Sequence, residues 1–95
     1  MTDELKALKE RVGLLDKQLE RMQIDFNGAL KTGETSKVKA TIKRLIFEAQ
    51  STKEYTRTLL SKFQKDNNYE KVNLCLKLLE YIEKLENVIL ALKEG

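Results

Sequence analysis

The chain of 95 residues contains no histidine, no proline and a single cysteine, and each absence narrows what it can do. Without histidine, the commonest general base and the commonest zinc ligand are missing. One cysteine, Cys75, excludes an internal disulfide and any zinc site built from several cysteines. Without proline, only Gly13 and Gly28 are positioned to interrupt a long helix.

Whole catalytic motifs are absent as well. The sequence holds no glycine-rich phosphate loop, no strand pattern to carry one and no serine at a nucleophile elbow. Asp16 and Glu20 are four residues apart but alternate with Lys17 and Arg21, which is typical of a salt-bridged helix surface. We therefore expect no enzyme, no bound metal or cofactor and no small-molecule substrate.

Long hydrophobic runs are also missing. No stretch approaches the roughly 18 uninterrupted apolar residues of a membrane span, and no charged-then-apolar leader opens the chain. Together with the lone cysteine, this favours a reducing compartment, and we expect a cytoplasmic protein. The length predicts one domain, residues 1–95, near the small end of what folds alone.

The sequence does contain a heptad pattern, in which apolar or small residues recur at alternating intervals of three and four residues. The first thirty residues carry eight such positions without a miss: Leu5, Leu8, Val12, Leu15, Leu19, Met22, Phe26 and Ala29. The pattern returns twice, which predicts helices over about residues 3–30, 36–65 and 68–93. We predict an all-α protein, an antiparallel three-helix bundle with coiled-coil-like heptad packing, because short loops reverse the direction of successive helices.

The residues around the first break match helix-end chemistry. Thr2 or Asp3 is expected to cap the first helix, and Thr35 or Ser36 the second, because their side-chain oxygens can accept the free N–H groups. Gly33 suits the left-handed position that ends the first helix.

The second break, residues 66–68, contains Asn67 with Glu70 three residues later, which resembles a capping box. Within the second helix, Thr52 and Thr56 take two consecutive seam positions. Their hydroxyls can donate to a carbonyl one turn earlier, so burial is tolerable but contributes little packing. We expect this part of the bundle to be its loosest.

The predicted third helix has the widest apolar face, and we expect it to lie at the centre of the bundle, in contact with two neighbours. A rival architecture is an oligomeric coiled coil, in which helices of separate chains pair. The regular turn-forming breaks favour the closed hairpins, so we expect a monomer or a weak dimer.

Positive charge is concentrated on the second helix, which carries an excess of six basic residues. Its eight basic residues are Lys37, Lys39, Lys43, Arg44, Lys53, Arg57, Lys62 and Lys65, against Glu48 and Glu54. Two interpretations stay open at this point: an acidic partner surface, or a solvated face partly neutralised by neighbouring helices.

Several large apolar residues lie off the seams with basic residues between them. The candidate partner-binding residues are Leu14, Lys17, Arg21, Ile24, Lys43, Arg44 and Phe47. Leu76 and Leu90 share a further outward heptad position on the third helix. Scattered exposed apolar residues are ordinary, and the alternative is a docking face with apolar anchors and a basic rim, which suits an acidic partner.

Residues 15–26 (LDKQLERMQIDF) and 38–42 (VKATI) resemble a BAG domain. The resemblance implies a three-helix cochaperone module that binds the nucleotide-binding domain of heat-shock chaperone ATPases. BAG domains place a basic cluster and a Val-Gln pair on the last helix and acidic residues on the middle one. Here the last helix begins YEKVNLCL and the middle helix is basic, so no chaperone-contacting residue carries over.

Residues 12–19 (VGLLDKQL) and 85–89 (LENVI) are similar to the first and last helices of GAT domains of trafficking adaptors, which bind ubiquitin. The resemblance implies that Leu79 and Glu83 match the leucine and the acidic residue of the last-helix ubiquitin site. Cys75 stands where that site has a leucine.

Among functions, we favour a protein–protein interaction module, such as a small adaptor, cochaperone or inhibitor, with a BAG-like or GAT-like activity as an alternative. A self-assembling coiled-coil structural protein is a second alternative. Nucleic-acid binding through the second helix ranks lowest, because its basic residues spread around the helix and no aromatic residues interleave to stack bases.

Overall fold

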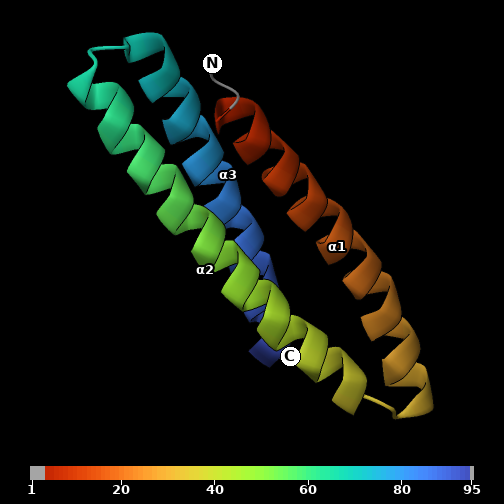
Figure 1. The fold of residues 1–95 in the computed structure, drawn as a ribbon. Helices are drawn as coiled ribbons and strands as arrows, with labels where there is room; N and C mark the ends of the chain where they lie inside the picture. Colours follow the sequence, from red (N-terminus) through yellow and green to blue (C-terminus); the bar gives the residue numbers. More distant parts are fainter. Residues whose placement is uncertain (1–3, 95) are drawn as a thin grey trace.

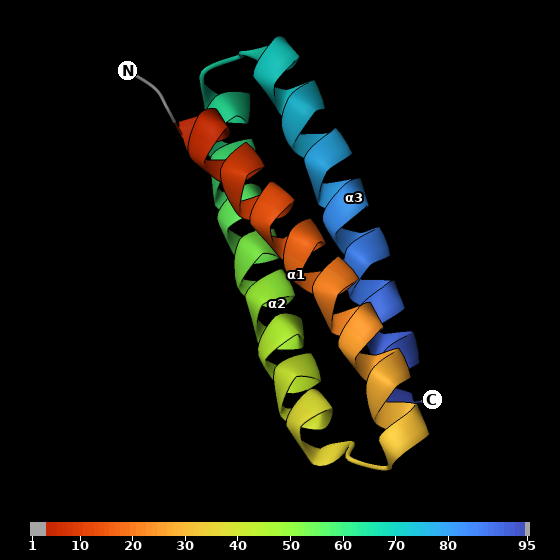
Figure 2. The same cartoon turned by 90° about the vertical axis from the view of Figure 1, so that its right-hand side faces the viewer.

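The computed structural model describes residues 4–94 as three helices joined by two tight turns (Figure 1). These are α1 (Glu4–Thr32), α2 (Ser36–Lys65) and α3 (Tyr69–Glu94). They run antiparallel along a bundle that measures 53 × 22 × 16 Å (Figure 2). The predicted all-α antiparallel three-helix bundle is confirmed. α1 ends two residues later than predicted, while α3 begins and ends one residue later.

The first turn confirms one predicted helix end and corrects another. Gly33 has a φ of 81°, and its N–H donates to the carbonyl of Ala29 at 2.7 Å, as the left-handed position requires. Thr35 makes no side-chain cap hydrogen bond, and α2 begins at the next residue, so the predicted hydroxyl cap is wrong. Thr35 already has helical backbone angles, which aim its hydroxyl away from the free N–H groups. The predicted caps Thr2 and Asp3 lie outside the described residues.

The second turn uses Asn67 and Asn68 in roles that differ from those predicted from the sequence. Asn67 takes a φ of 55°, and the N–H of Asn68 donates to the carbonyl of Phe63 at 2.9 Å, the long-range bond of a Schellman turn. The Asn68 side-chain oxygen then accepts the N–H of Lys71 at 3.3 Å. The predicted capping box of Asn67 and Glu70 is therefore wrong by one residue, because Asn67 is needed to end α2.

The central helix is α2, which corrects the expectation that the third helix lies at the centre. α2 packs against both neighbours, most extensively against α3, whereas α1 and α3 meet least. The broad apolar face of α3 is consequently not covered on both flanks. Five of its large hydrophobic residues remain 36–47% exposed: Leu74, Leu76, Tyr81, Val88 and Leu90.

The buried apolar side chains form two separate clusters. The first cluster, which includes the residues next to the α1–α2 turn, consists of Leu15, Leu19, Met22, Ala29, Val38, Ile42, Leu45, Ala49, Leu85 and Ile89. The second cluster, which includes the residues next to the α2–α3 turn, consists of Leu8, Val12, Leu59, Phe63, Val72, Cys75 and Ile82. Between them, α2 contributes Thr52 and Thr56, which are 2% and 0% exposed. Each hydroxyl donates to the carbonyl one turn earlier at 2.7 Å, as predicted.

Polar contacts tie the helices together near these threonines. The Lys53 ammonium lies 2.6 Å from the Glu86 carboxylate of α3, and both side chains are largely buried. The Arg11 guanidinium of α1 donates to the Ser51 hydroxyl at 3.4 Å and lies 5.1 Å from the centre of the Tyr55 ring. We call these five residues the polar belt. It joins α2 to both other helices where apolar packing is interrupted.

Candidate functional site

The candidate docking residues are exposed, as their heptad positions predict. Ile24 is 68% exposed, Phe47 is 70% exposed and Leu14 is 57% exposed. The four basic candidates, Lys17, Arg21, Lys43 and Arg44, are exposed too. Because each helix already buries a complete row on its inner face, these seven side chains are free of any role in the core.

The structure does not gather these residues into one patch. Leu14 lies at the edge of α1 that faces α2, where it lines a hollow of about 70 Å³ with Gln18 and Glu48. Phe47 instead lines a shallow depression on α2 that also includes Arg57. The sequence-predicted set therefore spans at least two surfaces, one on the α1–α2 side and one on the outer face of α2.

A cleft of about 520 Å³ opens near the α1–α2 turn, where all three helices contribute. We call it the basic cleft, and its lining residues are Phe26, Leu30, Thr35, Lys39, Ile42, Lys43, Leu92, Lys93 and Glu94. Ile42 is fully buried at its base, and Phe26 and Leu92 pack against the first cluster. Its volume lies within the roughly 300–1,000 Å³ typical of ligand sites.

The basic cleft carries an excess of positive charge. Lys39, Lys43 and Lys93 face one carboxylate, that of Glu94. Within residues 4–94, the salt bridges include none of these three lysines. Residues 36–47 of α2 contain no acidic side chain, and the positive end of the α2 dipole lies at the same place. A negative group entering this cleft would therefore meet several uncompensated positive charges.

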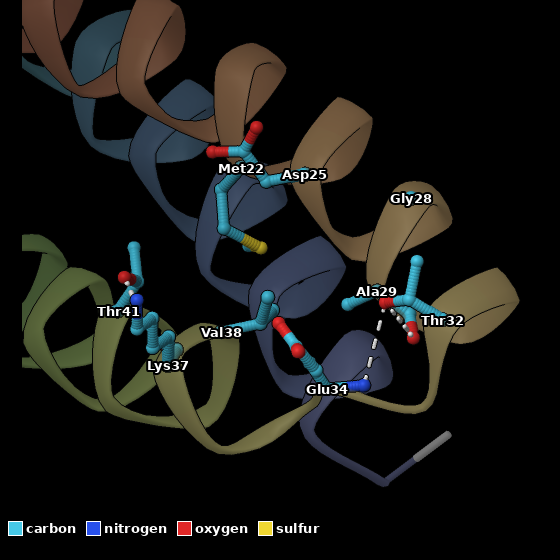
Figure 3. A pocket seen from close by; sticks show the side chains of 9 residues that line it. All are labelled: Met22, Asp25, Gly28, Ala29, Thr32, Glu34, Lys37, Val38 and Thr41. Carbon is cyan, nitrogen blue, oxygen red and sulfur yellow. Dashed lines mark hydrogen bonds between the residues drawn. The ribbon is translucent and has the colours of Figure 1, made fainter.

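A second cleft, of about 410 Å³, lies between α1 and α2 on the other side of the same hairpin (Figure 3). Met22 and Val38 belong to its lining, so its base is apolar as well. Its charged residues are Asp25, Glu34 and Lys37, which leave no positive excess. The two clefts thus share an apolar base but differ in charge.

Among residues 4–94, three side chains have pKa values shifted from their ordinary range. Burial raises the pKa of the Cys75 thiol, which keeps it neutral, and the predicted burial of this residue is confirmed. Hydrogen bonding to Asp16 of α1, with lesser effects of desolvation and charge, raises the pKa of Tyr81. An exposed hydrogen bond and ion pair with Glu4 raise the pKa of Lys62. None of these shifts brings a titration near neutral pH, so none indicates acid–base chemistry.

Residues 4–94 contain neither a metal-binding cluster nor a membrane-spanning helix. Within residues 4–94, no three acidic, cysteine or histidine side chains lie close enough together to hold a metal ion. No helix in this range combines the length and apolar character needed to cross a membrane.

Comparisons with protein-family models, curated proteins and solved structures found no match. Of the positions that the GAT resemblance singles out, Glu83 is exposed, Leu79 is half-buried and Cys75 is fully buried. A fully buried thiol has no surface to offer a partner at the position of the ubiquitin-binding leucine.

Sequence reasoning missed most of the basic cleft. Lys43 is among the partner-binding residues predicted from the sequence, but four other residues that line the cleft are not: Leu30, Lys39, Leu92 and Lys93. The sequence does place Leu30 and Leu92 near helix ends, where apolar side chains have fewer neighbours to cover them. Deciding that both ends meet beside the lysines of α2 required the tertiary arrangement.

Proposed function

We propose that this chain is a non-enzymatic protein–protein interaction module that docks a helical face on a larger partner with an acidic surface. The observation that carries the proposal is the exposure of Phe47 and Ile24 on helices whose inner faces are already buried. Large apolar side chains in such positions add nothing to folding. They act as anchors when a partner covers them.

The basic neighbours indicate the character of the partner. Lys43 and Arg44 lie one turn from Phe47 and belong to none of the salt bridges within residues 4–94. Burying one phenylalanine side chain contributes about 1.5–3 kcal/mol, and a positive rim adds rate and selectivity toward an acidic surface. The proposal covers a small adaptor, a cochaperone and an inhibitor alike.

The test is affinity purification with quantitative mass spectrometry on the wild type, Phe47→Asp, Ile24→Asp and Leu14→Asp. Leu76→Asp is the matched control, because Leu76 is 47% exposed on a different helix. We expect specific partners to fall at least tenfold with Phe47→Asp and to persist with the control. Equal recovery in all variants would remove these residues from the proposal. Circular dichroism checks that each variant remains helical.

A second candidate is self-association through α3. Leu74, Tyr81 and Val88 are spaced seven residues apart and are 36–40% exposed, so they repeat one heptad position along the exposed side of α3. Sedimentation velocity over a hundredfold concentration range tests it. A dimer that weakens with Tyr81→Glu supports this candidate, and a monomer throughout the range rejects it.

A further inference from the structure

Phe47 lies outside the basic cleft but follows Lys43, which lines it, by one helical turn. Lys39, Lys43 and Phe47 follow one another at intervals of four residues, so they form a single row on α2 about 12 Å long. Beside this row, Ile42 and Leu92 provide an apolar base. The row and the cleft thus bring together two cations one turn apart, an apolar base and an apolar side chain at one end.

We propose that the basic cleft receives an acidic amphipathic helix of a partner protein. The apolar side chains of that helix lie on Leu30 and Leu92, above the buried Ile42. Its carboxylates face Lys39 and Lys43, and its end reaches toward Phe47, one turn beyond Lys43. The inference rests on the proposed docking function and names the partner's chemistry. Residues i, i+4 and i+7 of an incoming helix lie on one face, which leaves its flanks free to carry the carboxylates.

The cleft on the other side of the hairpin supports this choice of ligand charge. It has a similar volume and an apolar base, yet Asp25 and Glu34 there outnumber Lys37. If the positive side chains served solubility alone, both sides of the hairpin would be expected to carry them. The three lysines and the apolar base coincide on one side only.

The shape of the cleft favours a helix over a small amphiphile. A fatty acid is held best by an enclosed cavity that covers most of its chain. Here Leu30 is 58% exposed at the edge of the cleft, so a bound acyl chain would stay largely in water. A helix several turns long covers the whole row.

The lysine pair can be altered without threatening the fold. Lys39 and Lys43 are exposed like charges four residues apart, an arrangement that slightly destabilises a helix. Lys39→Glu/Lys43→Glu reverses both charges and removes no buried contact. Lys37→Glu/Lys84→Glu is the matched control, because it changes net charge equally at exposed positions outside the basic cleft.

The probe is a synthetic 18-residue helical peptide with leucines on one face, glutamates on both flanks and one tryptophan. Because this chain contains tyrosine but no tryptophan, fluorescence excited beyond the tyrosine absorption band reports on the peptide alone. We expect the Kd to rise at least tenfold with Lys39→Glu/Lys43→Glu and less than twofold with the control. Equal weakening by both double variants would overturn the proposal, since it would show attraction to net charge only.

Nuclear magnetic resonance locates the bound probe on the full chain. The methyl groups of Ile42 and Leu92 are expected to shift on titration, and those of Leu14 to stay unchanged. Shifts confined to other residues would overturn the assignment to the basic cleft. Dodecanoate is titrated in parallel, and tighter, lysine-dependent binding of dodecanoate than of the peptide would overturn the choice of a helix.

The outcomes separate this inference from the docking function. If the peptide does not bind in the cleft while Phe47→Asp still abolishes capture of a partner, the inference fails and the proposed function stands. If the peptide binds the cleft but partner capture is insensitive to all docking variants, the proposed function fails as stated.

Discussion

The two ends of the bundle are closed in different ways, although both consist of a tight turn between antiparallel helices. At the α2–α3 end, Asn67 and Asn68 complete a Schellman turn and a helix cap, and Lys62 pairs with Glu4 across the helices. At the α1–α2 end, Thr35 supplies no cap. Both clefts of this hairpin open there, so the end with fewer stabilising contacts carries the candidate binding surface.

The two core clusters also differ in the size of their buried side chains. The first cluster contains Ala29 and Val38, small side chains that line the cleft of about 410 Å³. The second cluster contains the larger Phe63 and the fully buried Cys75. Segments used for binding are commonly the less stabilised parts of a protein, because binding surfaces are not optimised for folding. The proposed docking cleft thus lies at the end of the bundle with the fewer turn contacts.

The largest expected effects come from shortening a leucine in either cluster. Leu45→Ala and Leu59→Ala remove nearly fully buried side chains from the same helix, and each is expected to cost about 2–5 kcal/mol of unfolding free energy. Urea denaturation measures the loss, and native-state hydrogen exchange locates it. We expect each variant to accelerate exchange mainly in its own cluster. Uniform acceleration along the chain would show that the threonine layers do not divide the core.

The polar belt is tested by Glu86→Gln, which keeps the size of the side chain but removes its charge. Because Glu86 and Lys53 are both largely buried, we expect a loss of about 1–2 kcal/mol. Glu54→Gln is the control, since its pair with Arg57 is exposed and is worth about 0–0.5 kcal/mol. Equal losses in thermal unfolding would mean that the belt adds no special coupling between α2 and α3.

The two turns are compared by Asn68→Ala and Thr35→Ala. Asn68 accepts the N–H of Lys71, so its replacement is expected to cost about 1 kcal/mol. Thr35 makes no cap hydrogen bond, and its replacement is expected to change stability by less than about 0.5 kcal/mol. If both substitutions cost the same in urea denaturation, the difference between the turns is unimportant for stability.

The smallest effect concerns reactivity rather than stability. Burial raises the pKa of Cys75, so at pH 8 the folded protein has less reactive thiolate than an unfolded chain. We expect a disulfide reagent to label Cys75 slowly in the native protein and immediately in urea. Leu59→Ala is expected to speed native labelling more than Leu45→Ala. Fast labelling of the wild type would show that the second cluster opens readily.

Much of the fold could be predicted because heptad spacing depends on local geometry. The spacing of Thr52 and Thr56 sufficed to predict their burial and their hydrogen bonds one turn back. The turn at Gly33 was predictable because few other residues tolerate a φ of 81°. The order of Asn67 and Asn68 was not, because either asparagine suits either position and only the path of the chain between helices distinguishes them.

The candidate site was less predictable for a physical reason. The exposure of Leu14, Ile24 and Phe47 followed from their positions in the heptad. Which of them share a surface depends on how the helices are rotated and how far each extends. A broad apolar stripe on α3 indicated a central helix, yet the stripe stayed partly exposed because α2 took that place.

By itself, the amino-acid sequence determined the number of helices, their inner faces and the charge of α2, since each of these depends on residues a few positions apart. Only the tertiary structure decided which helix is central, that the core is divided in two, and that Lys39, Lys43 and Lys93 meet around one apolar cleft. Those features depend on contacts between residues far apart in the chain. No local pattern encodes the relative rotation of packed helices.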